Sequence, residues 1–202
     1  MLTYAELDSS KKAFIFELDN VLYPEKDYLL QVYYLFASFL EYTEAYPPAA
    51  ELVSFFSKAY EHAGPKLIFD KAAEAFGIHQ KYRENFRRLH QQARLPLKLL
   101  LFDHALKLLQ EIVIDRKEII IVTGGDPIQQ LNKIRQTEWN GLEKYLRVYF
   151  ADELKPKPAP DVLMHILEIH HLVAEEVLIT GSDRLDAVFA ANAGIDFVKA
   201  YK

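Results

Sequence analysis

Short apolar runs alternate along the chain with longer segments in which apolar residues recur every three or four positions. The short runs lie at 13–18, 119–123, 148–151, 177–180 and 196–199. Each is mostly apolar throughout, as the strands of a parallel sheet are when helices cover both of its faces. The longer segments lie at 103–112, 127–136, 160–171 and 186–193. We therefore predict a doubly wound, Rossmann-like α/β core whose ligands bind at the carboxyl ends of the strands.

The interval between the first two predicted strands has helical pattern only. It includes the segments DYLLQVYYLFASFLEYTEAY and AAELVSFFSKAYEHAG. So long a helical stretch exceeds what a crossover connection needs. We therefore predict two domains: an α/β core formed by residues 1–22 plus 99–202, and an inserted all-helical cap, 23–98, over the mouth of the sheet.

Composition restricts the possible functions. Of the 202 residues, 50% are hydrophobic and 13% aromatic, which is enough for a packed core. A net charge of -5 offers no basic excess for nucleic acid or an anionic membrane. The absence of cysteine excludes disulfides, thiolate metal sites and a cysteine nucleophile. The first apolar run is too short for a signal peptide or a membrane span, so we expect a cytoplasmic protein.

Polar residues follow four of the predicted strands. Glu17 and Asp19 end the first strand on one face, because alternate residues of a strand point the same way. The segments TGGD, KPKPAPD and GSDRLD follow the next three. An isolated pair of acids at a strand end is most often only solvated, but the carboxyl ends of parallel strands meet at one edge. Carboxylates gathered there can serve as nucleophile, general acid and base, or Mg2+ ligands.

The residues at the ends of the first two predicted strands resemble motifs of the haloacid dehalogenase-like (HAD) superfamily, whose members are mostly Mg2+-dependent phosphatases. FIFELDNVL is similar to the first motif, hhhDxDx(T/V)L, except that Glu17 stands where the family has its nucleophilic Asp. IIIVTGG resembles the second motif, an apolar strand that ends at Thr123. The phrases LDNVLYP and QQLNKIR look closest to the nucleotidase-like and phosphoglycolate-phosphatase-like branches.

The remaining two segments continue the resemblance in the same order. KPAPDVL resembles the third motif with Lys157, and Lys155 is the competing candidate. VLITGSDRLD resembles the fourth motif, with Ser182 where the first acid belongs and Asp186 as the last acid. The helical insertion lies where the family has its commonest cap.

By resemblance the chain would be a Mg2+-dependent phosphomonoester hydrolase acting on a small phosphorylated metabolite. The implied catalytic residues are Glu17, Asp19, Thr123 and Lys157. The implied phosphate ligands are Thr123, Gly124 and Lys157. The implied Mg2+ ligands are Glu17, Asp19, Asp183 and Asp186, with Ser182 at the usual acid position.

Two positions depart from the family pattern. The added methylene of Glu17 moves its carboxylate by roughly 1.5 Å, and a displacement of about 1 Å in a reacting group can cost on the order of a hundredfold in rate. Ser182 offers a hard cation a neutral hydroxyl, and the adjacent Asp183 points to the other side of an extended rim. We therefore predict a degenerate site with weak or no turnover, in which Glu17 pairs with Lys157 in the absence of metal. The alternative is a non-catalytic member of the fold that binds phosphate, another ligand or a protein.

Other candidate features favour structural roles. The seven histidines include no HExxH, and His165, His170 and His171 do not share one helical face, so we predict no zinc site. KYRENFRRLHQQAR reads as a solvated helix face, with contact to an anionic substrate as the alternative. The aromatic residues of YLLQVYYLFASFLEY should form the cap core or, alternatively, a dimer seam. The chain could therefore be a monomer or a dimer.

Overall fold

The chain consists of two compact units, and the computed structural model describes residues 2–200. The first unit comprises Met1–Glu25 and Leu99–Lys202, and the second comprises Lys26–Lys98. The assignment of the second unit as a substrate-selecting cap stays a prediction.

A five-stranded parallel sheet in the order β5-β3-β1-β6-β7 forms the centre of the first unit. Its strands are β1 (Ala13–Phe16), β3 (Glu118–Thr123), β5 (Leu146–Phe150), β6 (Val177–Gly181) and β7 (Asp196–Lys199). The predicted doubly wound α/β core is thus confirmed. A separate pair of two-residue strands, β2 (Leu99–Leu100) and β4 (Thr137–Glu138), was not predicted, because two residues are too few to show a period.

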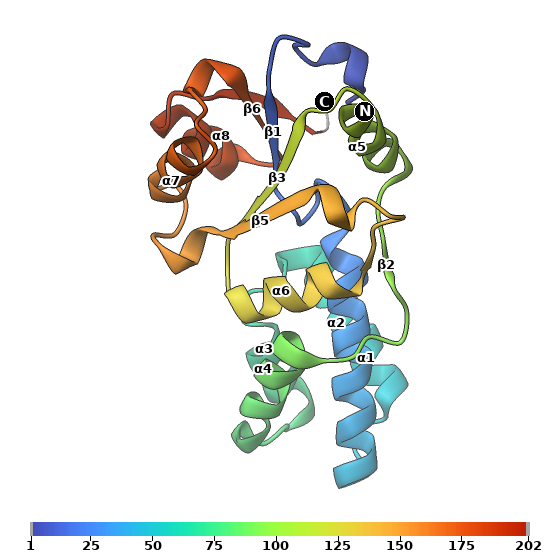
Figure 1. Cartoon of the computed structure of the whole chain (residues 1–202). Coiled ribbons are helices and arrows are strands. Elements are labelled where there is room, and N and C mark those ends of the chain that lie inside the picture. Colours follow the sequence, from blue (N-terminus) through green and yellow to red (C-terminus); the bar gives the residue numbers. More distant parts are fainter. Residues whose placement is uncertain (1, 201–202) are drawn as a thin grey trace. The chain divides into compact units, whose positions relative to one another are not determined.

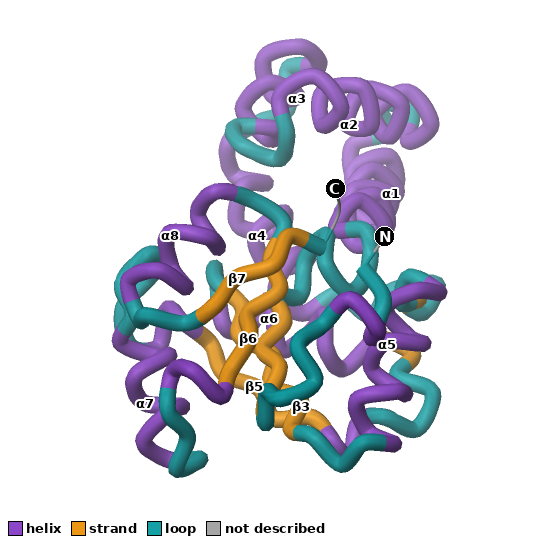
Figure 2. The backbone as a smooth tube through the Cα atoms, turned by 90° about the horizontal axis from the view of Figure 1, so that it is seen from above, coloured by secondary structure: helices purple, strands orange, loops and turns teal. Residues whose placement is uncertain are grey.

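Helices cover both faces of this sheet (Figures 1 and 2). They are α5 (Asp103–Ile114), α7 (Asp161–Ile169) and α8 (Arg184–Asn192), while α6 (Pro127–Gln136) follows β3. Both views show α5 on one side of the strands and α7 and α8 on the other. On the α7 and α8 side, Ala13 and Ile15 of β1 belong to one buried apolar cluster with Val162 and Phe189. The intervening Phe14 and Phe16 are also buried, so both faces of β1 are covered, and an apolar run without alternation is what such a strand requires.

Four helices form the second unit: α1 (Glu25–Glu44), α2 (Ala49–Ala63), α3 (Ile68–Phe76) and α4 (Arg83–Gln92). The aromatic residues of α1 supply its core, as one of the two sequence interpretations predicts. Tyr33 is fully buried and stacks on Phe56 and Phe86, with ring centroids 4.8 and 5.9 Å away. Short 3-10 helices complete the two units: η1 (Tyr4–Glu6), η2 (Gln80–Tyr82), η3 (Glu143–Tyr145), η4 (Ala151–Glu153) and η5 (Ala174–Glu176).

The basic helix of the second unit carries ion pairs on its surface. Arg87 and Arg88 both bond Glu84, and Arg83 pairs with Asp70. These arginines and Arg94 are exposed, which fits the predicted solvated face. None of the helices within residues 2–200 combines the length and the apolar character needed to cross a bilayer.

Candidate active site

A cavity of about 320 Å3 lies in the first unit at the carboxyl ends of its strands. Seven of the residues predicted from the sequence line it: Glu17, Asp19, Gly124, Lys157, Ser182, Asp183 and Asp186. Thr123, the last residue of β3, is fully buried and contacts the cavity residue Glu17. The structure therefore brings together the site residues that the family resemblance implies.

Glu17 follows β1 directly and uses both carboxylate oxygens within the protein. Its Oε1 accepts hydrogen bonds from the Thr123 hydroxyl at 2.6 Å and from the backbone N–H of Leu18 at 3.0 Å. Its Oε2 accepts from the Lys157 ammonium, so the pairing predicted for these two residues is present. Burial raises the pKa of Glu17, and the attraction of Lys157 and the Thr123 hydrogen bond offset only part of that effect.

Lys157 joins two acids from different elements, Glu17 just after β1 and Asp186 in the first turn of α8. Its ammonium bonds Glu17 and also donates to Asp186 Oδ1 at 2.8 Å, and its side chain is 7% exposed. Burial by itself would lower the pKa of Lys157, but the attraction of Glu17 and Asp186 outweighs burial, so its pKa is raised. The competing candidate Lys155 is exposed and pairs with Asp161 instead.

Asp19 is held by three side chains, two of them on α6. Its Oδ1 accepts from the Tyr23 hydroxyl at 2.7 Å. Its Oδ2 accepts from Gln130 Nε2 at 3.0 Å and from Lys133 Nζ at 2.6 Å. Sequence reasoning assigned no role to these three residues. The available signal was the position of QQLNKIR in the helix that starts just past the second motif.

The loop after β3 is held against the loop after β5. The backbone N–H of Gly125 donates to Asp152 Oδ2 at 2.8 Å, and Asp152 also lines the cavity. Asp126 then begins α6 as its N-cap, since its Oδ1 accepts from the N–H groups of Ile128 and Gln129. This arrangement fixes the start of α6, and with it the side chains that reach Asp19.

The two acids of the segment GSDRLD, Asp183 and Asp186, have different positions at the start of α8. Asp183 is the N-cap of α8 and accepts from the Asp186 N–H at 3.0 Å. Asp186 lies in the first turn of α8 and accepts from the Ser182 N–H at 2.9 Å. A side chain on Gly181 would collide with Asp186, because an added Cβ would lie 2.4 Å from the Asp186 Cβ. Glycine at the end of β6 is therefore what allows Asp186 to lie so close to the strand.

The Mg2+ site implied by the resemblance does not fit this arrangement. Mg2+ is bound through oxygen ligands in near-octahedral geometry. Here Glu17 and Asp186 bind Lys157, and Asp19 binds Lys133. Within residues 2–200 there is no group of three or more His, Cys, Asp or Glu side chains that could hold a metal ion.

Acidic groups dominate the cavity. Its lining includes six carboxylates, those of Glu17, Asp19, Glu25, Asp152, Asp183 and Asp186, and the single ammonium of Lys157. Such a lining repels a phosphate dianion unless further cations accompany it.

Comparison with known proteins agrees with the fold. A family model described as haloacid dehalogenase-like hydrolase matches residues 14–200. A search of curated protein sequences finds no match.

Solved structures with the same fold include three bacterial proteins. A candidate β-phosphoglucomutase of Thermotoga maritima is 22% identical, with a TM-score of 0.60 over 91% of this chain and 82% of that chain. A candidate phosphoglycolate phosphatase of Lactobacillus plantarum is 20% identical, with a TM-score of 0.55 over 94% and 86%. A candidate HAD-hydrolase of Bacillus subtilis, bound to magnesium, is 19% identical, with a TM-score of 0.60 over 93% and 87%. With its family match over nearly the whole sequence, the chain belongs to the haloacid dehalogenase-like hydrolases.

Proposed function

We propose that the chain is a phosphatase-type scaffold for a small phosphorylated metabolite. Its turnover is weak or absent because Glu17 already accepts hydrogen bonds from the groups that would donate to the phosphate. One observation carries the proposal: the Glu17 carboxylate accepts from both the Thr123 hydroxyl and the Lys157 ammonium. These are two of the three residues that the family resemblance assigns to the phosphoryl group, the third being Gly124. A phosphate must displace the Glu17 carboxylate before it can reach either of them.

The charge of the cavity supports the same conclusion. Catalysis of phosphoryl transfer depends on positioning and on neutralising the charge of the transferred group. The one lysine in the lining is already shared between Glu17 and Asp186. Loss of a metal ion removes several kcal/mol of transition-state stabilisation. The proposal includes a cytoplasmic location, a monomer or dimer, and neither nucleic acid nor membrane as partner.

The test is hydrolysis of p-nitrophenyl phosphate with and without Mg2+. The native chain is compared with the Glu17→Asp, Ser182→Asp double variant, and Lys155→Ala serves as a control outside the cavity. We expect Mg2+-dependent turnover in the double variant to exceed native turnover by about a hundredfold or more, because the shorter acid restores the reach of the nucleophile. Native turnover equal to that of the double variant and abolished by a chelator would overturn the proposal.

A second candidate function is non-catalytic binding of a phosphate or similar anion. The supporting observation is that the Thr123 hydroxyl and the Lys157 ammonium converge on one anionic group, the Glu17 carboxylate. This function predicts no turnover with any phosphoester but a melting temperature that rises with the anion, because a ligand that binds only the folded state stabilises it.

A further inference from the structure

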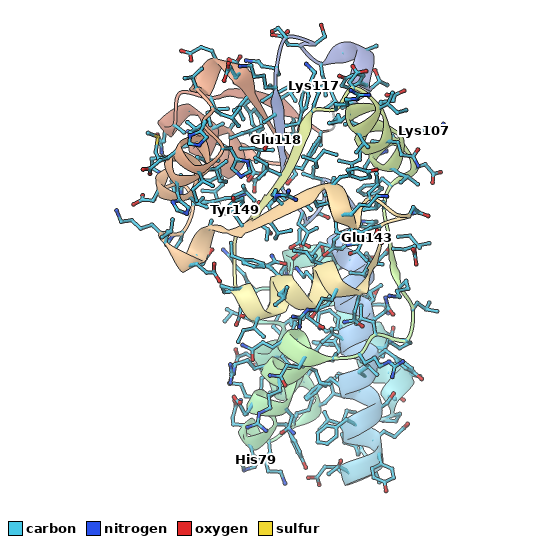
Figure 3. The ribbon with its side chains drawn as sticks, in the orientation of Figure 1. His79, Lys107, Lys117, Glu118, Glu143 and Tyr149 are labelled. Atoms are coloured by element: carbon cyan, nitrogen blue, oxygen red, sulfur yellow. The ribbon has the colours of Figure 1, made fainter. Side chains whose placement is uncertain are left out.

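A second, larger cavity lies at the other end of the strands of the same sheet. Its volume is about 520 Å3, and it lies at the amino ends of β3 and β5. Those ends are adjacent, because Ile119 of β3 is in register with Leu146 of β5. Figure 3 labels Lys117 and Glu118 at the start of β3 and Glu143 at the start of η3. The candidate active site, at the carboxyl ends, does not share any lining residue with this cavity.

Three exposed cations line this cavity from three segments. Arg116 follows α5, Lys144 belongs to η3, and Arg147 is the second residue of β5. Within residues 2–200, none of the three takes part in an ion pair. Their charges are therefore available to a ligand in a chain whose net charge is -5.

Glu118, the acidic residue that lines the cavity, already contacts another side chain. Glu118 Oε2 lies 2.6 Å from His170 Nδ1, and the other ring nitrogen of His170 lies 2.8 Å from the Tyr149 hydroxyl. This chain of contacts fixes the Glu118 carboxylate against α7 and β5. The Lys117 ammonium is likewise engaged, since it donates to the carbonyls of Ser9 and Lys11. The groups left to meet a ligand are therefore mainly cationic.

An aromatic ring lies beside the cations. Tyr145 is 45% exposed, and Lys144 Nζ is 5.0 Å from the centre of its ring. The apolar side chains of Val113 and Ile119 complete the lining. A flat apolar surface next to two guanidinium groups suits a ligand that carries both a ring and phosphates, because guanidinium binds phosphate in a bidentate manner and aromatic rings stack.

We propose that this cavity binds a nucleoside diphosphate, with Arg116 and Arg147 on the phosphates and Tyr145 against the base. The volume falls within the range of small-molecule sites. Arg116 adopts a positive φ of 57°, a conformation in which glycine is favoured, yet the chain has an arginine there. The site is independent of the function proposed for the other edge of the sheet.

The test is calorimetric titration of the full chain with ADP, adenosine and pyrophosphate, without added metal. We expect ADP to bind one molecule per chain and more tightly than either fragment. Arg116→Gly, which suits the positive φ, and Arg147→Gln should each weaken ADP binding about tenfold, since each removes a charge-assisted hydrogen bond. Lys107→Ala, on the exposed surface of α5 outside the cavity, should leave ADP binding unchanged.

Each contrary result overturns the proposal. Absence of heat with ADP would exclude the site. Unchanged ADP affinity in both Arg116→Gly and Arg147→Gln would show that the nucleotide binds outside this cavity. Pyrophosphate binding as tight as that of ADP would show that the base is not recognised, and Tyr145→Leu should then have no effect.

Discussion

Lys133 and Asp19 form an ion pair in which the lysine side chain is 1% exposed and Nζ lies 2.6 Å from Oδ2. Gln130, one turn earlier on α6, donates to the same carboxylate oxygen. Because α6 begins just past the carboxyl end of β3, its first two turns bring both side chains to the edge where Asp19 lies. Asp19, which the resemblance implies is a catalytic residue, is thus oriented by a neighbouring helix.

Replacing Lys133 with Met should destabilise the protein strongly. The variant keeps an unbranched stem but leaves the Asp19 carboxylate, 16% exposed, without its cation. Breaking a buried ion pair from one side costs about 3 kcal/mol or more of the free energy of unfolding. Urea denaturation measures this loss. Lys155→Met is the matched control, since Lys155 pairs with Asp161 while 67% exposed, and an exposed pair contributes less than about 1 kcal/mol. Equal losses in the two variants would contradict the prediction.

The contrast between Asp19 and Lys133 shows what could be read from the sequence. Glu17, Asp19, Thr123 and Lys157 follow apolar runs, and the ends of parallel strands must meet, so their proximity could be predicted. Lys133 is different because its role depends on how α6 is rotated about its own axis. The polar residues of QQLNKIR do not specify which side chain faces the sheet.

The ends of strands and helices could be predicted from the sequence only where the hydrophobic pattern changes abruptly. The run from Ala13 to Leu18 is apolar except for Glu17, yet β1 ends at Phe16. The chain turns just beyond, where Asn20 has a φ of 58° and its N–H bonds the Tyr23 carbonyl. Backbone hydrogen bonds determine that turn, and the spacing of apolar residues in the sequence does not indicate it. Both acids therefore lie beyond the end of β1, and Asp19 directly precedes the turn.

The stability of Glu17→Gln relative to the native protein should rise with pH. Burial raises the pKa of Glu17 above its ordinary value of 4.5. A raised pKa in the folded state means that the stabilisation is present below the unfolded pKa and is lost as pH rises through the folded pKa. Glutamine does not ionise, so the variant avoids this loss. Melting temperatures of both proteins between acid and neutral pH measure the difference.

Glu84→Gln should show the opposite slope in the same experiment. The hydrogen bond from Arg87 lowers the pKa of Glu84 to about 2. A lowered pKa gives the native protein stability above the unfolded pKa, which is lost as pH falls through the folded value. The Gln variant should therefore become less stable relative to the native protein as pH rises. Parallel slopes for the two variants would contradict the assignment for Glu17.

Removing the Glu17 carboxylate should strengthen phosphate binding. Glu17→Ala leaves the Thr123 hydroxyl and the Lys157 ammonium without the carboxylate that now engages them. A charge-assisted hydrogen bond is worth roughly 1.5–3 kcal/mol, so affinity should rise about tenfold or more. The measurement is the melting temperature as a function of inorganic phosphate at constant ionic strength. Adding Lys157→Met to the alanine variant should abolish the gain; if the gain persists, phosphate binds elsewhere.

Gly181→Ala should disturb the site through Asp186 alone. An added Cβ would lie 2.4 Å from the Asp186 Cβ and 2.6 Å from its Oδ2, so Asp186 must move. The movement would break its bond with the Ser182 N–H and its contact with Lys157. Such overpacking costs about 1–3 kcal/mol of the free energy of unfolding. Gly124→Ala is the control within the same cavity, since its added Cβ would meet Asp152 at an ordinary 3.6 Å. Urea denaturation compares the two variants, and equal stability would mean that β6 can shift to accept a side chain without displacing Asp186.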